Sequence, residues 1–349
     1  MTAPAHRPIW IYSAPGSGAS WWEGPPFEVG EYGRTVLDFN HQPIGYPIGG
    51  YLGLLGGDPS LSYNQVIADE AAELTRLLGL NPDVQAALAK AQAAQSAGVP
   101  VEWVTGEDLE LWFTAYSQSG DGMVVAVCAL FGAGGQYELL QSRINGLLIF
   151  GNPARQPLPD KVGNNAPGSG ISRKVFPAWI NDLTWSITAT TPDGPDFYAA
   201  CNDEIRPLFY EVIVEANTSF SFFEHVCMLV IPILINTFAP FLGPLGALAD
   251  GIVVPLLTAV TGLSGGLVSQ AVTASKPDGE IDPTDAEVQA KLTALFTAQG
   301  IITNIPALIT LVSDLGGIQS HGTYDDPHHE FGGRTGVQVA TDVMDAFRR

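Results

Sequence analysis

The sequence contains few cysteines and few positive charges. Its 349 residues include 3 cysteines, and 15 lysines and arginines stand against 36 aspartates and glutamates. The cysteines are few and do not have the spacing of metal ligands, so neither a disulfide framework nor a zinc site is expected. A formal net charge of −21 repels phosphate backbones, so nucleic acid is not an expected partner. A neutral or lipid substrate fits this composition better.

Motifs for cofactors and metals are also missing. The loop Ala14-Pro-Gly-Ser-Gly-Ala-Ser20 has closely spaced glycines, but no lysine follows them, so it does not match a phosphate loop or a dinucleotide site. There is no His-Glu-x-x-His helix, and adjacent histidines such as His328 and His329 cannot both face one ion from a regular element without contortion. Their acidic surroundings are typical of a solvated loop or a fortuitous chelator. We therefore expect neither a cofactor nor a functional metal.

A secretory signal is absent, and the longest uncharged run is interrupted. Residues 1–8 are polar and contain proline, and Ile9-Trp-Ile-Tyr12 already has the composition of a strand, so secretion by the usual route is not expected. Val226 to Ala249 carries no charge and is long enough to be considered as a membrane span. Several prolines and Asn236 interrupt this run. We interpret it as short buried or lid-forming helices, with a membrane span as the alternative.

The composition favours a folded α/β protein. With 46% hydrophobic and 15% charged residues, the chain can bury a substantial core. Apolar runs alternate with segments of helical periodicity, which predicts a central, mostly parallel sheet covered by helices. Gly24 to Asp58 is rich in glycine and proline and is expected to be irregular. The predicted strands are Ile9–Tyr12, Leu109–Tyr116, Gly146–Phe150 and Trp185–Thr190, and the predicted helices are Gln65–Leu80, Asn81–Ala97 and Ser119–Leu130.

A candidate nucleophile lies where an apolar strand meets a helix-compatible segment. The strand ends at Ser117, and a tight turn there would expose its hydroxyl above the sheet, beside backbone N–H groups that can hold an oxyanion. The usual pattern is Gly-x-Ser-x-Gly, because both flanking positions must be small. Here they are Ala115 and Ser119, which are small as well. The segment therefore predicts a relaxed form of the nucleophile elbow.

A serine nucleophile needs a base and a carboxylate that orients the base. In hydrolases of this kind the chain order is serine, then acid, then histidine. The acid should follow a late strand, which leaves Asp193 and Asp196 as candidates. His321, in a polar loop near the C-terminus, is favoured as the base over the adjacent pair of histidines that follows it. For the oxyanion, Gln118 supplies a backbone N–H by position, and Ser17 in the loop after the first strand is the candidate second donor.

Five stretches of the chain resemble cutinases and, more closely, the lysin B family of mycobacteriophages. Ala115-Tyr-Ser-Gln-Ser119 resembles the elbow of both groups. Leu148-Ile-Phe-Gly-Asn-Pro-Ala-Arg-Gln156 resembles the strand and loop of lysin B that end in Gly-Asn-Pro-Met-Arg-Gln, and it is the most specific match. The remaining stretches are His41-Gln-Pro-Ile-Gly45, Pro192-Asp-Gly-Pro-Asp-Phe-Tyr-Ala199 and Ser320-His-Gly-Thr-Tyr-Asp-Asp-Pro327.

The resemblance implies an α/β-hydrolase that uses Ser117, Asp196 and His321 as its triad. It further implies an esterase that cuts the ester between mycolic acids and arabinogalactan. Its domain plan would be a hydrolase core in residues 1–206, an apolar helical lid or linker in 207–283 between the acid and the base, and a segment 284–349 that completes the core with a helix and the histidine loop.

Two roles are compatible with this resemblance. The protein could be made in the host cytoplasm without a signal peptide and act on the host envelope at lysis. Alternatively, it could be a tail or tip protein of the virion that contacts other virion proteins and binds the host on a lysin B-like scaffold, with or without residual esterase activity. The relaxed elbow motivates this alternative.

Overall fold

The computed structural model describes residues 8–16, 19–45, 63–101, 109–156, 161–172, 174–201 and 316–347. Within these residues, five strands form one sheet in the order β2-β1-β3-β4-β5, and every neighbouring pair is parallel. The central strands are almost entirely buried and apolar, as expected when both faces of a parallel sheet are covered. The strands are β1 (Ile9–Ala14), β2 (Asn40–Pro43), β3 (Glu110–Tyr116), β4 (Ile144–Phe150) and β5 (Thr184–Ile187).

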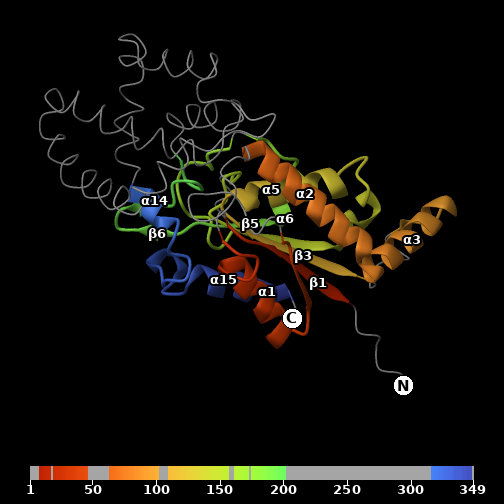
Figure 1. Cartoon of the computed structure of the whole chain (residues 1–349), viewed down its shortest axis with the longest axis horizontal. Coiled ribbons are helices and arrows are strands. Elements are labelled where there is room, and N and C mark those ends of the chain that lie inside the picture. The colour runs from red at the N-terminus through yellow and green to blue at the C-terminus, as the bar shows by residue number, and fades with distance from the viewer. Residues whose placement is uncertain are drawn as a thin grey trace, which may run out of the picture.

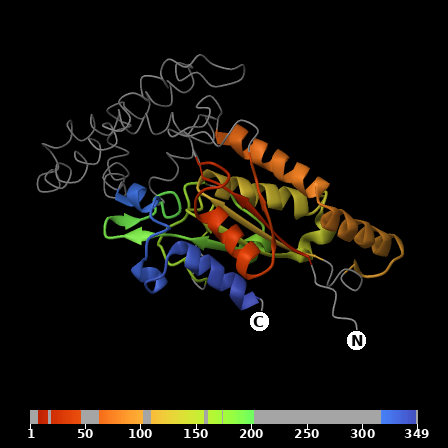
Figure 2. The same cartoon turned by 60° about the horizontal axis from the view of Figure 1, so that its bottom comes forward.

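Helices cover both faces of the sheet (Figure 1). On one face α1 (Pro25–Val36) lies beside α15 (Gly336–Phe347), and their apolar side chains pack on alternate residues of the strands. On the other face α2 (Tyr63–Leu80) packs on α5 (Gln118–Phe131), as Figure 2 also shows. The other helices on this second face are α3 (Pro82–Ser96), η1 (Glu138–Arg143) and α6 (Ala178–Leu183).

Strands and helices appear at most of the predicted places, but two expectations need correction and one helix was not predicted. Gly24 to Asp58 is not irregular throughout, because it contains α1 and β2. Two prolines open α1, where their missing N–H groups cost no hydrogen bond. The predicted strand Trp185–Thr190 ends at Ile187, since the backbone leaves the sheet at Thr188. The C-terminal helix α15 was not predicted.

The segment after residue 315 returns to the sheet and packs against the loops that follow its strands. α14 (Gly316–Ser320) contacts a small hairpin made of β6 (Thr190–Thr191) and β7 (Gly194–Pro195), and η4 (His329–Phe331) follows it. The predicted lid, 207–283, and the first part of the C-terminal segment lie outside the described residues, as does Val226 to Ala249. Among the helices that are described, none is both long enough and apolar enough to cross a membrane.

Candidate active site

Ser117 occupies a strained turn between β3 and α5. Its φ of 62° and ψ of −134° place it in a region that residues other than glycine rarely adopt. Two hydrogen bonds hold the turn: the Ser117 N–H donates to the carbonyl of Phe150 at 2.9 Å, and the Gly120 N–H donates to the carbonyl of Ser117 at 2.8 Å. A parallel sheet with helices on both faces and a serine at this turn is the architecture of an α/β-hydrolase, as predicted.

Each small residue around Ser117 is required for a different structural reason. Ala115 is fully buried in the sheet. A Cβ atom on Gly120 would lie 2.5 Å from Cγ2 of Ile149, so the helix can approach β4 only because this position is glycine. Ser119 is also fully buried, and its hydroxyl donates toward the backbone carbonyls of Pro15 and Tyr116. The serine that replaces the second elbow glycine therefore ties the elbow to the loop after β1.

The structure brings Ser117, His321 and Asp196 together. His321 Nε2 lies 2.8 Å from Ser117 Oγ, and His321 Nδ1 lies 2.8 Å from Asp196 Oδ2. The serine and the histidine are 204 residues apart in the chain. Asp196 is fully buried, whereas Asp193, the other candidate acid, is exposed. The arrangement can pass a proton from the hydroxyl to an imidazole that a dry carboxylate orients.

A glycine makes room for the contact between the acid and the base. Gly151 follows β4 and has a φ of 55°. A Cβ atom there would lie 2.6 Å from Cε1 of His321 and 2.7 Å from Oδ2 of Asp196. Both the backbone conformation and the space thus require glycine at this position. The first residue of the Gly-Asn-Pro-Ala-Arg-Gln loop therefore has a direct role in the geometry of the site.

Aromatic side chains enclose the imidazole of His321. The ring of Tyr116 stacks on it with 4.8 Å between centroids and 29° between planes, and the ring of Tyr198 lies against it at 4.3 Å. The hydroxyl of Tyr116 also donates to the backbone carbonyl of His321. Burial raises the pKa of Tyr116 above its ordinary value, so its hydroxyl remains a donor. These contacts leave His321 little freedom to turn away from Ser117.

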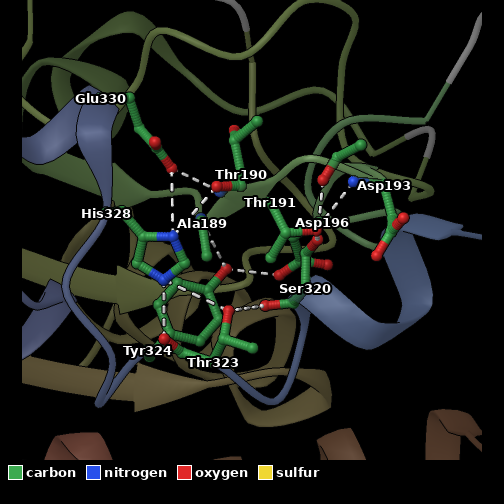
Figure 3. Close-up of polar contacts among 11 residues, drawn as sticks. Ala189, Thr190, Thr191, Asp193, Asp196, Ser320, Thr323, Tyr324, His328 and Glu330 are labelled. Carbon is green, nitrogen blue, oxygen red and sulfur yellow. Dashed lines mark hydrogen bonds and ion pairs between the residues drawn. The ribbon is translucent and has the colours of Figure 1, made fainter.

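A polar network joins the hairpin before Asp196 to the loop that carries His321 (Figure 3). The hydroxyl of Ser320 donates to the carbonyl of Gly194 at 2.7 Å. His328 is buried, with Nδ1 3.0 Å from the carbonyl oxygen of Thr190 and Nε2 2.7 Å from that of Thr323. His328 is thus a structural link rather than part of a solvated loop. Its neighbour His329 is exposed, as that prediction expected.

Arg155 is buried beneath the acid loop and holds several backbone carbonyls. Its guanidinium donates to the carbonyl of Ala199 at 2.8 Å and to that of Gly168 at 3.0 Å. It also donates to Ala166 and to the side chain of Asn164. Burial lowers the pKa of Arg155 to about 10, while the charge of Asp196 acts in the opposite direction. Arg155 therefore links the loop at residues 164–168 to the backbone that follows the acid, and it remains a cation at neutral pH.

Of the two predicted oxyanion donors, Gln118 lies within the described residues and Ser17 does not. Gln118 is the first residue of α5, so its N–H belongs to the helix N-terminus, where backbone donors and the helix dipole favour negative charge. Ser17 lies outside the described residues, although its neighbour Gly16 is described and packs against the ring of Tyr116. The donor contributed by the loop after β1 remains a prediction.

Neither a protein-family model nor a curated protein sequence matches the chain. Among solved structures, the chain is similar to lysin B from Mycobacteriophage D29, with 18% identity and a TM-score of 0.38 over 57% of this chain and 68% of that one. It is also similar to a cutinase-like protein from Cryptococcus sp., with 15% identity and a TM-score of 0.34 over 54% of this chain and 78% of the other. The site is therefore interpreted from its own geometry.

A second serine, histidine and carboxylate lie on the sheet face covered by α1. Ser13 Oγ in β1 is 2.7 Å from His41 Nε2 in β2, and His41 Nδ1 is 2.9 Å from Glu31 Oε1 in α1. Burial lowers the pKa of His41. Hydrogen bonds from Arg34, and then from His41, lower the pKa of Glu31 to about 2. This arrangement was not predicted, because the expected chain order of serine, acid and histidine does not admit a histidine that precedes the nucleophile.

No group of three or more potential metal ligands occurs among the residues that the structure describes. Arg155 and Tyr324 are among the residues of the active-site region that were not predicted to act there. Arg155 was noted only as part of a loop that resembles lysin B, and Tyr324 only as a landmark after the histidine. An arginine in the loop directly after an apolar strand, in a chain with few positive charges, is a signal that could have identified the first of them.

Proposed function

We propose that the protein is a serine esterase in which Ser117 is the nucleophile, His321 the general base and Asp196 the residue that orients the base. The observation that supports this most strongly is the continuous hydrogen-bonded path from Ser117 Oγ through His321 to a fully buried Asp196. The strained turn supports it too, because strain of this kind is characteristic of catalytic nucleophiles.

In the proposed reaction, Ser117 Oγ attacks the ester carbonyl carbon while His321 Nε2 accepts the hydroxyl proton. The carbonyl oxygen becomes an oxyanion beside the N–H of Gln118, with Ser17 as the proposed second donor. When the intermediate collapses, the C–O bond to the alcohol breaks and His321 returns the proton to the leaving oxygen. Water then attacks the acyl-enzyme with His321 as the base, which releases the acid and restores Ser117.

The proposed natural substrate is the ester between mycolic acids and arabinogalactan in a mycobacterial-type envelope. Support comes from the loop Gly151-Asn-Pro-Ala-Arg-Gln156, whose glycine and arginine have structural roles at the site. The acidic composition also favours a neutral lipid ester over an anionic polymer. On this proposal the enzyme is made in the host cytoplasm and acts on the envelope when the cell lyses.

Hydrolysis of p-nitrophenyl butyrate and laurate by wild-type protein and Ser117→Ala tests the proposal. We expect turnover by the wild type and a loss of about 10³-fold or more in the variant, because the nucleophile and the group that the base acts on are removed together. Circular dichroism and the melting temperature establish that the variant is folded. A Ser117→Ala protein that hydrolyses either ester at the wild-type rate would exclude Ser117 as the nucleophile.

A virion-borne binding protein on the same scaffold is the second candidate, and the replacement of both elbow glycines by Ala115 and Ser119 favours it. It predicts that folded wild-type protein binds mycobacterial envelope lipid or glycan without hydrolysing the esters, and that it forms a defined complex with other virion proteins. Folded protein that turns over neither p-nitrophenyl ester but sediments with envelope fragments would support this candidate over the esterase.

A further inference from the structure

We propose that Tyr324 is a positioning residue whose hydroxyl holds the carboxylate of Asp196 and weakens its attraction for the protonated form of His321. This inference rests on the proposed function, because it concerns the same acid and base. It assigns a fourth member to the hydrogen-bonded path, a tyrosine whose hydroxyl donates to the carboxylate oxygen that His321 also contacts.

The hydrogen bonds around Asp196 determine which group donates. Oδ1 accepts the N–H of Tyr198 at 2.9 Å. Oδ2 accepts from two sides, from His321 Nδ1 at 2.8 Å and from the hydroxyl of Tyr324. The hydroxyl of Tyr324 also receives the N–H of Ala189 at 3.4 Å, so its own proton is directed at Asp196. Tyr324 and His321 thus share one carboxylate oxygen (Figure 3 shows Tyr324 with Asp196).

Packing holds Tyr324 in this position. Its ring is buried and meets the rings of Tyr116 and Phe150 edge to face, each at 5.6 Å between centroids. The backbone of Gly336 approaches closely, and a Cβ there would lie 3.0 Å from the Tyr324 ring. Burial, together with the charge of Asp196, raises the pKa of Tyr324 well above its ordinary value. The hydroxyl therefore keeps its proton throughout the range of an esterase assay.

A proton donated to Oδ2 draws negative charge away from the oxygen that faces the imidazole. Removing that donor leaves more charge to stabilise the imidazolium, so the base stays protonated, and inactive, to a higher pH. The other charged and polar groups around Asp196 and His321 would be unchanged in a variant that lacks the Tyr324 hydroxyl, so their effect on the pKa of the base would be the same in both proteins. They are Arg155, whose positive charge interacts with that of Asp196, together with Tyr116, Tyr198 and Asp325.

The pH dependence of kcat/KM for p-nitrophenyl butyrate, measured for wild type and Tyr324→Phe, tests the inference. We expect kcat/KM to fall about tenfold at its optimum, since a hydrogen bond to a charged group is lost. The acidic limb should move to higher pH by about half a unit to one unit. Tyr12→Phe is the matched control: it removes a buried tyrosine hydroxyl that contacts Asn81 at 2.9 Å and does not touch the triad, so it should leave the acidic limb unchanged.

Site-specific incorporation of 3-fluorotyrosine at position 324 gives a test of opposite sign. Fluorine makes the phenol a stronger donor while the ring and hydroxyl are kept, so the acidic limb should move to lower pH. If Tyr324→Phe and the 3-fluorotyrosine protein are both active and both keep the acidic limb at the wild-type pH, the inference is overturned while the proposed function stands. Wild-type protein without turnover would overturn the proposed function, and this inference with it. A drop in melting temperature without a change in the limb would show Tyr324 to be only structural.

Discussion

The protein contains two serine–histidine–carboxylate arrangements with nearly the same hydrogen-bond lengths, and their burial runs in opposite directions. In the first, the His321 side chain is 14% exposed and Asp196 is 0% exposed. In the second, the His41 side chain is 2% exposed and that of Glu31 is 33% exposed. In the first arrangement the histidine is accessible to solvent and the carboxylate is buried. In the second the histidine is buried and the carboxylate is accessible to solvent.

The backbone distinguishes the two serines as well. Ser117 ends β3 in a strained turn, while Ser13 lies within β1, paired with Thr114 on one side and Pro43 on the other. A serine inside a regular strand cannot meet a substrate carbonyl beside a helix N-terminus. We therefore interpret Ser13, His41 and Glu31 as a link between β1, β2 and α1. Hydrogen-bond geometry alone does not make a nucleophile; the strained turn and the exposure of the histidine distinguish Ser117 from Ser13.

The largest expected difference comes from replacing the two histidines. His321→Gln should lower kcat/KM by about 10³-fold or more, because the base is lost. His41→Gln should keep kcat/KM per folded molecule within about threefold but lower the free energy of unfolding by about 1–3 kcal/mol, because buried hydrogen bonds are broken. Steady-state kinetics and urea unfolding of both variants check this. If His41→Gln abolished turnover while remaining folded, the distinction between the two arrangements would be wrong.

Two glycines provide the next contrast, since each leaves space for one of the histidines. The Cβ of an alanine at position 151 would clash with His321 and Asp196. Its backbone would also have to adopt a φ of 55°, which is unfavourable for residues other than glycine. Gly151→Ala should therefore lower kcat by about 10²-fold, as expected when reacting groups are displaced by about 1 Å. Gly30→Ala would press on His41 in the same way. It should cost about 1–3 kcal/mol of stability with little effect on kcat. Equal losses of kcat in the two folded variants would contradict this account.

The smallest expected effect concerns the exposed acid. Hydrogen bonds from Arg34, and then from His41, lower the pKa of Glu31 from its ordinary value of 4.5 to about 2. Its contribution to stability is therefore complete above about pH 4.5 and is lost as the pH falls toward 2. Glu31→Gln should melt at a temperature within about 1–3 °C of the wild type at pH 7, because exposed ion pairs contribute little. The difference should shrink between pH 4.5 and 2; a difference that grew there would contradict the assigned pKa direction.

The sequence predicted local elements well where a pattern depends on neighbours in the chain. The apolar runs of β1, β3 and β4 were recognisable, and so was the serine that ends β3, because its turn needs small residues nearby. α1 was missed because its glycines and prolines are typical of irregular segments, although prolines in the first turn favour a helix. The polar end of β5 was misplaced for a similar reason: threonine suits a strand, and only the fold shows where pairing stops.

Contacts between segments far apart in the chain could not be predicted from local sequence patterns. Asp193 and Asp196 could not be separated by chain order, and only the resemblance to lysin B favoured Asp196. The contact of Tyr324 with Asp196 joins residues 128 positions apart, and the link between Ser13 and His41 depends on the register of β1 and β2. Such contacts follow from sheet order and helix placement, which no single stretch of sequence specifies.

The central claim is that Ser117, and not Ser13, is the nucleophile. Reaction with a p-nitrophenyl alkylphosphonate, followed by peptide mass spectrometry, tests it most directly, because the probe forms a stable bond to an activated serine oxygen and releases p-nitrophenol. This account predicts one adduct per molecule, on the peptide that contains Ser117, and none on the peptide that contains Ser13. An adduct on Ser13, or folded protein that stays unlabelled while it still hydrolyses p-nitrophenyl butyrate, would contradict it.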